Sequence, residues 1–415
     1  MKAGLFGRGL LVSFILSGLV SCGGGAGGGL AGGGIGGTGM SQGPVTGFGS
    51  VFVNGIEFAT EGAEIEVEGQ TGVTQAKLGV GMVVRVEWEK DASGKFIAKR
   101  IKYADDVQGP VAGIIPATTG TGGTFTVLGQ TIKVDALTVF SGTTGFAGLA
   151  GGQIVEVSGL RDANGDIRAT RVEVKTGTTE VELKGVVSSL GNPSGTFSIG
   201  ATTVNYISLP GGVINGVCVE VKGTASGAVI TATSIEFDDS CSLGGTKNGE
   251  EVEIEGFVTG LSGDTFSVNG VAVSVASLPS SGYENGTNAN LVNNVRVEVE
   301  GKITNGVLIA QKVKFKLGGD DGASGGGSGG DGSGGGIVFG EIKGQVTSVT
   351  SPNTLSIFDG AKTVIVTVNN DTLFEDGIQR NLGNVTTSNF LKINFYTKDG
   401  TSTNIATKVE REGDD

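Results

Sequence analysis

Residues 266–270 read Phe-Ser-Val-Asn-Gly, and residues 310–313 read Ala-Gln-Lys-Val. In the first stretch apolar and polar residues alternate up to an Asn-Gly pair, which is typical of a half-buried strand that ends in a tight hairpin turn. The second stretch follows a glycine turn at Asn305-Gly306 and is typical of a closing strand. The two stretches together predict a small unit built of β-strands.

Both stretches recur along the chain. Looser copies of the hairpin stretch lie at 51–55, 125–129, 197–200 and 355–360, and copies of the alanine stretch lie at 98–101, 169–172, 232–235 and 406–409. We expect each alanine to lie where the closing strand packs closely against the interior. Because self-similarity at a period of roughly 60–75 residues indicates tandem units, the sequence predicts five divergent copies of one domain.

The fold class predicted from this pattern is all-β, a tandem array of about five small OB-like barrels of five to six strands each. Closure into a barrel buries a core and leaves no edge strand exposed. The 79 glycines among 415 residues also weaken any helix. The predicted copies span residues 44–106, 107–177, 178–247, 248–317 and 337–411, with a Gly/Ser/Asp linker at 318–336 and an acidic tail at 412–415. The short junctions between the first four copies predict a semi-rigid rod, and the linker predicts a fifth copy that moves independently.

The units resemble an uncharacterised β-domain that is repeated in exported bacterial lipoproteins. The matching features are a Val-x-Gly opening, the hairpin at 266–270, the Val-Glu-Val-Glu-Gly run at 297–301 and the closing Ala-x-x-Val. The resemblance covers residues 44–411 and implies an OB-like strand pattern. It implies no activity and supplies no catalytic residues.

The N-terminus has the pattern of an export signal. Lys2 and Arg8 precede an apolar stretch at 10–20, which is too short to span a bilayer as a stable helix. The following Leu-Val-Ser-Cys22 resembles the bacterial lipobox, which implies that residues 1–21 are removed and that the thiol of Cys22 carries a diacylglycerol. Gly23 in place of Asp implies sorting to the outer membrane. The alternative is an ordinary secretory signal, and in both interpretations residues 22–43 form a Gly-rich tether.

Composition excludes several classes of function. The chain has no histidine, which removes Ser-His-Asp and Cys-His catalysis and His-bound zinc. The net charge of −13 argues against nucleic-acid binding. We therefore expect no enzyme activity, no catalytic residues, no cofactor and no metal site. Cys218 and Cys241 lie in the same predicted copy of an exported chain and are expected to form a disulfide.

Acidic residues at alternate positions are the remaining candidates for chemistry. They are Glu64, Glu66 and Glu68, then Glu251, Glu253 and Glu255, and finally Glu298 and Glu300. We expect them to form solvated outer faces that oppose aggregation, and the alternatives are calcium binding or a carboxylate-dependent glycan hydrolase. The Asp-Ala-Asn-Gly-Asp run at 162–166 is expected to be a hairpin turn rather than a calcium loop.

Three functional hypotheses follow. The first is a non-enzymatic, lipid-anchored envelope protein that acts as a scaffold, spacer or binding rod, with the membrane and envelope proteins as partners. Its ligand contacts would lie on the variable loops at 141–152 and 277–290. The second is a module that binds extracellular polysaccharide or, less favoured, single-stranded nucleic acid through Arg85, Lys99, Arg100, Lys102 and Tyr103. The third is the glycan hydrolase.

Overall fold

The computed structural model describes residues 37–118, 122–191, 194–242, 244–316, 337–350, 353–369, 372–379, 382–398 and 403–412. The expected signal sequence at 1–21, the lipidation site Cys22 and the linker at 318–336 lie outside these residues. Within the described ranges, no helix combines the length and the apolar character needed to cross a bilayer.

Each copy is a barrel of five strands that close in the order 1-2-3-5-4-1. In copy 2, β8 (Val107–Pro116) pairs with β9 (Gly123–Val127), and β9 pairs with β10 (Gln130–Val134). β10 runs parallel to β13 (Ile167–Lys175), β13 pairs antiparallel with β12 (Ile154–Arg161), and β12 returns to β8. This is the strand order of an OB barrel. The prediction of an all-β array of five OB-like barrels is therefore confirmed.

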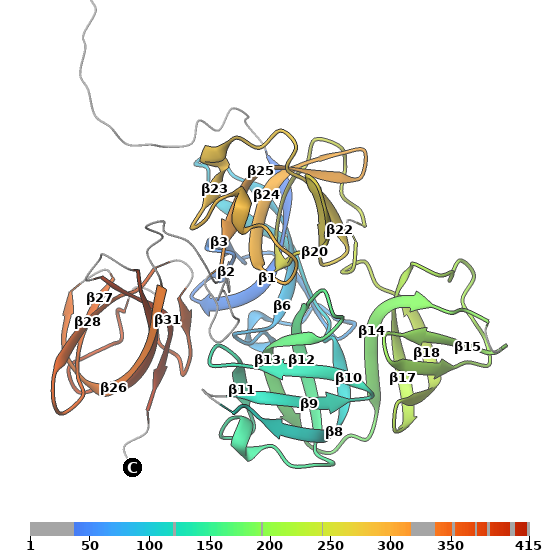
Figure 1. Cartoon of the computed structure of the whole chain (residues 1–415), viewed down its shortest axis with the longest axis horizontal. Coiled ribbons are helices and arrows are strands. Elements are labelled where there is room, and N and C mark those ends of the chain that lie inside the picture. Colours follow the sequence, from blue (N-terminus) through green and yellow to red (C-terminus); the bar gives the residue numbers. More distant parts are fainter. Residues whose placement is uncertain are drawn as a thin grey trace, which may run out of the picture. The chain divides into compact units, whose positions relative to one another are not determined.

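The other four copies repeat this order. In Figure 1 the colours follow the sequence and so mark the copies from blue (copy 1) to red (copy 5). Copy 1 comprises β1 (Thr38–Phe48), β2 (Val51–Val53), β3 (Ile56–Ala59), β6 (Val83–Lys90) and β7 (Phe96–Tyr103). Copy 3 comprises β14 (Val181–Ser188), β15 (Thr196–Ile199), β16 (Thr202–Asn205), β17 (Cys218–Ser226) and β18 (Val229–Phe237). Copy 4 comprises a split first strand, β19 (Glu251–Phe257) and β20 (Thr259–Ser262), and then β21 (Thr265–Val268), β22 (Val271–Ser274), β24 (Arg296–Thr304) and β25 (Val307–Phe315). Copy 5 comprises β26 (Ile337–Thr350), β27 (Thr354–Phe358), β28 (Thr363–Thr367), β30 (Phe390–Lys398) and β31 (Asn404–Arg411).

A short extra strand runs parallel to the last strand in copies 1, 2, 4 and 5. These strands are β4 (Glu64–Val67), β11 (Val139–Ser141), β23 (Tyr283–Glu284) and β29 (Leu373–Phe374), and β4 also pairs with β5 (Gln70–Thr71). Single 3₁₀ turns lie at η1 (Gln75–Lys77), η2 (Phe146–Gly148), η3 (Ser280–Gly282) and η4 (Asn288–Asn290). The extra strand lengthens the segment between the third and fourth strands, where the copies differ most.

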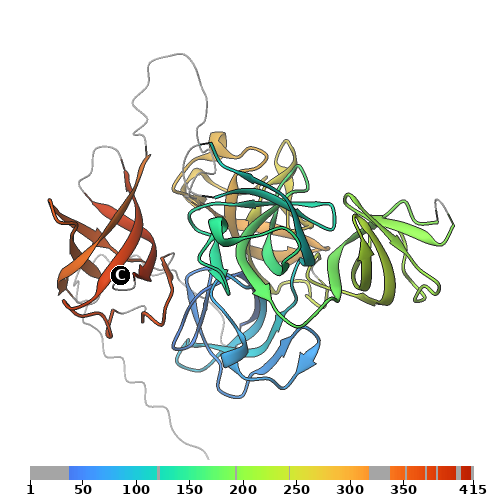
Figure 2. The same ribbon diagram turned by 90° about the horizontal axis from the view of Figure 1, so that it is seen from below.

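The barrel interiors are filled by every second residue of each strand. In copy 1, Val51, Val53 and Phe58 are fully buried, whereas the residues between them on the strands are more exposed. The same alternation fills copy 5, whose strands curve around a closed barrel in Figure 2. The period of two read from the sequence is therefore the period of the core.

The Asn-Gly pairs form the expected hairpin turns between the second and third strands. Asn54 and Gly55 have φ values of 53° and 81°, and Asn269 and Gly270 have φ values of 49° and 78°. Two successive residues with positive φ match the twist of the hairpin strands. The amide of Asn54 also donates to the carbonyl of Gln42 on the first strand, and that of Asn269 donates to the carbonyl of Glu255.

The Ala-x-x-Val signature marks a β-bulge. In copy 4, Gly301 pairs with Ala310 and Glu300 pairs with Lys312, so that Gln311 has no partner in the register. The same one-residue shift after the alanine occurs in all five copies. The alanine is buried in copies 1, 2, 4 and 5 and half-buried in copy 3. A bulge increases the local twist, which lets the last two strands curve around a small barrel.

Strand pairing also joins one copy to another. β1 runs parallel to β19, with Gly39 opposite Glu251 and Gln42 opposite Ile254, so that copies 1 and 4 share one sheet. β14 pairs with β8 through two residue pairs and joins copies 3 and 2. Copies 1 and 4 are not consecutive in the chain, so the strand pairing between copies does not follow chain order.

The first copy begins earlier than predicted. β1 starts at Thr38, inside the segment assigned to the tether at 22–43, and Met40 is buried in the core cluster of copy 4. Glycine content suggested a tether here. Gly39 instead allows close approach, because an added Cβ would overlap the Trp88 ring and the carbonyl oxygen of Glu251.

The bulge makes a prediction about stability. A Cβ at Gly301 would overlap the carbonyl oxygen of Ile309, so we expect Gly301→Ala to destabilise copy 4 by about 1–3 kcal/mol, as overpacking does. Amide hydrogen exchange of β24 and β25 measures the loss. Gly211→Ala is the control, because nothing lies within 4 Å of its added Cβ. Equal protection in both variants would show that the close approach is not required.

Candidate functional site

Three of the eight carboxylates predicted to be solvated are buried. Glu253, Glu255 and Glu298 are 7%, 1% and 6% exposed. β1 covers this part of β19, and the hydroxyl of Ser41 donates to Glu253 at 2.9 Å. The expectation of a solvated face is therefore wrong for these three residues, because a neighbouring copy takes the place of solvent.

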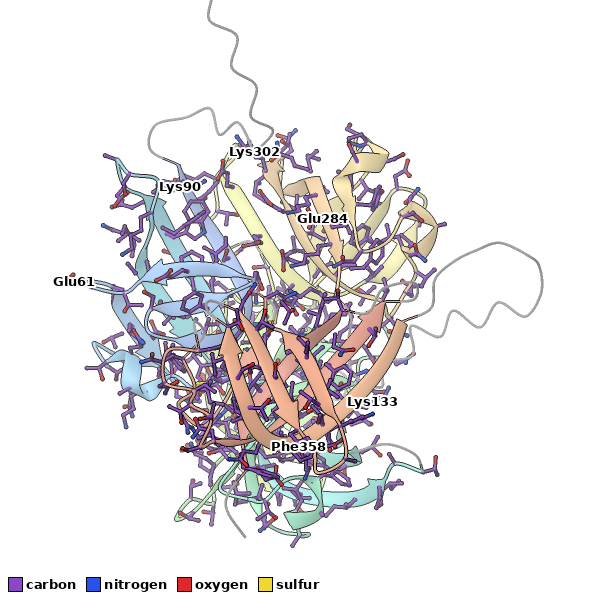
Figure 3. All side chains as sticks on the ribbon, turned by 90° about the vertical axis from the view of Figure 1, so that its left-hand side faces the viewer. Glu61, Lys90, Lys133, Glu284, Lys302 and Phe358 are labelled. Atoms are coloured by element: carbon purple, nitrogen blue, oxygen red, sulfur yellow. A yellow bond between two sulfur atoms is a disulfide. The ribbon has the colours of Figure 1, made fainter. Side chains whose placement is uncertain are left out.

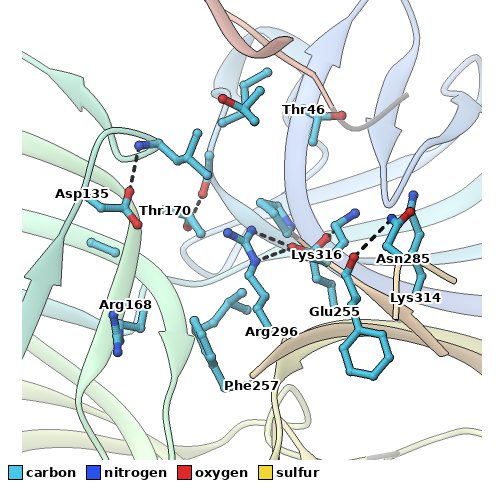
Figure 4. A pocket seen from close by; sticks show the side chains of 18 of the residues that line it. Thr46, Asp135, Arg168, Thr170, Glu255, Phe257, Asn285, Arg296, Lys314 and Lys316 are labelled. Carbon is cyan, nitrogen blue, oxygen red and sulfur yellow. Dashed lines mark hydrogen bonds and ion pairs between the residues drawn. The ribbon is translucent and has the colours of Figure 1, made fainter. Parts of the chain in front are cut away.

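Glu255 is held by two cations of its own copy. Arg296 Nε donates to Glu255 Oε1 at 2.7 Å, and Lys316 Nζ lies 3.2 Å from Glu255 Oε2 (Figure 4). Burial alone would raise the pKa of Glu255, but the positive charges of Lys316 and Arg296 outweigh it and lower the pKa. Beside them Arg168 of copy 2 lies over the ring of Phe257 at 5.5 Å. A cation–π interaction between copies 2 and 4 thus lies beside ion pairs that are internal to copy 4.

A cavity of about 330 Å³ lies where copies 1, 2, 3 and 4 meet. Its lining includes the cations Arg85, Lys102 and Lys184 and the anions Asp106 and Asp238. Lys102 Nζ lies 3.1 Å from Asp238 Oδ2 and 3.2 Å from Asp239 Oδ1, which places a cation of copy 1 against anions of copy 3. The charges of this cavity are largely paired with one another.

The five residues predicted to bind a ligand do not form one face. Arg85 and Lys102 line the cavity, and Arg85 donates to the carbonyls of Asp239 and Gly244. Tyr103 is 1% exposed and donates to Glu156 at 2.9 Å. Lys99 and Arg100 have carboxylate partners within copy 1, Glu89 at 3.2 Å and Glu66 at 2.5 Å. Most of this set therefore joins the copies or pairs internally, and no aromatic residue of the set faces solvent.

The disulfide predicted in copy 3 is present. Cys218 at the start of β17 is bonded to Cys241, with the two Cα atoms 5.8 Å apart. Asp238 and Asp239 lie three and two residues before Cys241 and contact Arg85 and Lys102 of copy 1. The disulfide therefore fixes the segment through which copy 3 contacts copy 1.

The run at 162–166 is a turn. Asp162 Oδ1 accepts hydrogen bonds from the backbone amides of Asn164 and Asp166, and its Oδ2 accepts from Arg168 and Lys133. Both oxygens are thus occupied by donors of the protein. Asp91 accepts the equivalent backbone bonds in copy 1.

The structure also brings together three carboxylates that no pattern in the sequence relates to one another. Oxygen atoms of Glu68, Asp105 and Glu182 all lie within 4.8 Å of one another. Glu68 follows β4, Asp105 lies in the junction between copies 1 and 2, and Glu182 lies on β14 of copy 3. Only tertiary structure joins them, since no spacing in the sequence relates the three positions.

Burial makes ionisation of this acidic cluster, Glu68, Asp105 and Glu182, unfavourable. Burial, and then the negative charges of Glu156 and Glu182, raise the pKa of Glu68 to about 8. The pKa values of Asp105 and Glu182 are also raised, primarily by burial. Asp105 Oδ1 and Glu68 Oε2 are buried and accept no hydrogen bond. The cluster therefore has acceptor capacity that the protein itself does not satisfy.

The fold and these contacts define the class of protein: an array of OB-type barrels in which charged groups are buried between copies. The chain belongs to the family described as Domain of unknown function (DUF5666), whose model matches residues 42–102, 108–173, 246–314 and 343–410. These matches correspond to copies 1, 2, 4 and 5.

Two further comparisons add little. No curated protein matches this chain. Among solved structures it is similar to the drosophila protein "Unr CSD456", with 16% identity over 55% of this chain and 96% of that one and a TM-score of 0.14. At this score the similarity supports no conclusion about arrangement or function.

The contact between copies 1 and 3 predicts a pH-dependent loss of stability. Although burial raises the pKa of Asp238, the charges of Lys184 and Lys102 and the hydrogen bonds from Ser240 lower it to about 2. The lowered pKa stabilises the fold above the unfolded value near 4, and this stabilisation is lost as pH falls toward 2. At about 1.4 kcal/mol per pKa unit, Asp238→Asn should cost about 2 kcal/mol at pH 7.

Amide hydrogen exchange of the hairpin formed by β17 and β18 measures this cost. The difference from the unaltered chain should shrink between pH 4 and pH 2. Asp264→Asn is the matched control, because Asp264 is exposed. A cost that stays constant over this pH range would contradict the assigned role of the Asp238 charge.

Proposed function

We propose that this chain is a non-enzymatic, lipid-anchored protein of a bacterial cell envelope whose barrels serve as a scaffold or spacer. One observation carries the proposal: charged side chains on the outer faces of the barrels join one copy to another. Lys102 of copy 1 binds Asp238 of copy 3, and Ser41 of copy 1 binds Glu253 of copy 4. Side chains engaged in this way build an assembly rather than a site for substrate.

The membrane anchor in this proposal rests on the lipobox-like sequence that ends at Cys22. Several acyl chains on one residue give lasting attachment, and the glycine-rich segment that follows gives the barrels reach from the membrane. Gly23 supports the outer membrane as the destination.

We expect Cys22→Ser to abolish incorporation of labelled palmitate and to move the chain from the membrane fraction to the soluble fraction. Gly23→Asp should keep the label but retain the protein in the inner membrane. Metabolic labelling followed by membrane fractionation checks both variants. Unchanged labelling of the Cys22→Ser chain would contradict the lipoprotein assignment.

A second function is favoured by copy 5, in which the face of strands β27 and β28 carries exposed apolar side chains. Phe358, labelled in Figure 3, is 41% exposed, and Ile365 on the neighbouring strand is 59% exposed. The corresponding face of OB barrels binds oligosaccharides and oligonucleotides. Because the chain is acidic, we propose an envelope polysaccharide as the ligand class rather than a nucleic acid.

In-cell crosslinking separates the two functions. If copy 5 binds a polysaccharide, the chain should capture one glycan reproducibly, and Phe358→Ser should reduce the yield at least fivefold. Val292→Ser is the control, because it removes an exposed apolar side chain from copy 4. Capture of neighbouring envelope proteins alone, unchanged by Phe358→Ser, would support the scaffold and exclude the glycan.

A further inference from the structure

The acidic cluster contains oxygen atoms for which the protein supplies no partner. Asp105 is 1% exposed and its Oδ1 accepts no hydrogen bond, and Glu68 Oε2 is likewise buried without a partner. The other oxygen of Glu68 accepts the backbone amide of Asp105 at 2.9 Å. A buried acceptor without a donor costs free energy, so these oxygens favour a ligand that carries positive charge.

The neighbouring lysines leave two members of the cluster without an ion pair. Lys222 is bound to Glu182 at 2.7 Å, whereas Lys175 is bound to Glu156, outside the cluster, at 2.8 Å. Lys184 donates to the carbonyl of Ala104 at 2.8 Å. Among the described residues, no lysine or arginine forms an ion pair with Glu68 or Asp105.

The donor set suits calcium. All three residues offer carboxylate oxygens, and these oxygens lie within 4.8 Å of one another, so one ion can contact all three. Calcium accepts irregular arrangements of carboxylates at about 2.3–2.6 Å, whereas magnesium requires near-ideal octahedral geometry and keeps several waters. A chain without histidine also provides no nitrogen ligand for a transition metal here.

A cavity reaches one member of the cluster. It has a volume of about 420 Å³, lies between copies 1 and 2 and is lined by Glu68, Glu156 and Glu173. Glu68 belongs both to this cavity and to the acidic cluster. The cluster is therefore approached from the side of Glu68.

We propose that Glu68, Asp105 and Glu182 bind one calcium ion at the junction of copies 1, 2 and 3. Each residue contributes one carboxylate, from the turn after β4, the segment before β8, and β14. Binding links three parts of the array that are far apart in sequence, so calcium stabilises the arrangement of these copies. The site is independent of lipid anchoring and of any ligand of copy 5.

The test is calorimetric titration of CaCl2 into the whole chain after removal of metals with a chelator. We expect one calcium ion per chain, and binding of MgCl2 at least tenfold weaker. Asp105→Asn and Glu68→Gln should each weaken calcium binding at least tenfold. Glu61→Gln, which removes an exposed carboxylate of the same copy, should change the affinity less than twofold.

Amide hydrogen exchange of the unaltered chain gives a second measurement, which requires no variant and is therefore unaffected if a variant fails to fold. Calcium should increase protection at residues 67–69, 103–106 and 181–184 and leave copy 5 unchanged. Absence of binding heat at about 10 mM CaCl2, well above the weakest constants usual for extracellular sites, would overturn the proposal. Equal affinity of the Asp105→Asn chain and the unaltered chain would overturn it too.

Discussion

Every barrel has a glycine on its first strand just before that strand changes partner. β8 pairs with β12 up to Pro110 and with β9 from Val111, and Gly109 lies one residue before the last pair with β12. The equivalent residues of the other copies are Gly43, Gly185, Gly256 and Gly344. A side chain at Gly256 would overlap Asn269, and one at Gly344 would overlap the carbonyl oxygen of Phe358. The glycine therefore leaves room for the neighbouring strand where the first strand passes from one side of the barrel to the other.

The residue before each of these glycines shows how a copy meets its neighbours. In copies 1 to 4 it is Gln42, Gln108, Lys184 or Glu255, and each is buried. Three of the four side chains donate to a backbone carbonyl outside their own copy: Gln42 to Ser240 and Gln108 to Glu180, both of copy 3, and Lys184 of copy 3 to Ala104 at the end of copy 1. In copy 5 the same position is Lys343, which is exposed and pairs with Glu412, the residue directly after β31. One position therefore distinguishes the four joined barrels from the fifth.

The barrels themselves were largely predictable from the sequence. The hairpin turns are indicated by local sequence such as the Asn-Gly pairs, and the core is indicated by the alternation of apolar and polar residues. Both patterns can be read within one copy, and their recurrence in the other copies supports the prediction. The role of the outer faces was not predictable. Alternation at Glu251, Glu253 and Glu255 identifies residues that leave the barrel interior, but the covering strand β1 comes from more than two hundred residues away. The acidic cluster was missed for the same reason, as was the start of β1 at Thr38.

Charged contacts between copies add little stability, because the free energy needed to remove both charges from water nearly cancels their attraction. Divergent copies of one domain have similar outer faces, and apolar faces would allow several wrong pairings during folding. Charge pairs oppose such mismatches. Lys102 of copy 1 meets Asp238 and Asp239 of copy 3, and a surface that carried a cation in place of these carboxylates would repel it. The disulfide acts in the same direction, since it holds Asp238 and Asp239 ready for copy 1. Polar contacts thus specify which copies join, whereas the buried apolar cores of the barrels provide most of the stability.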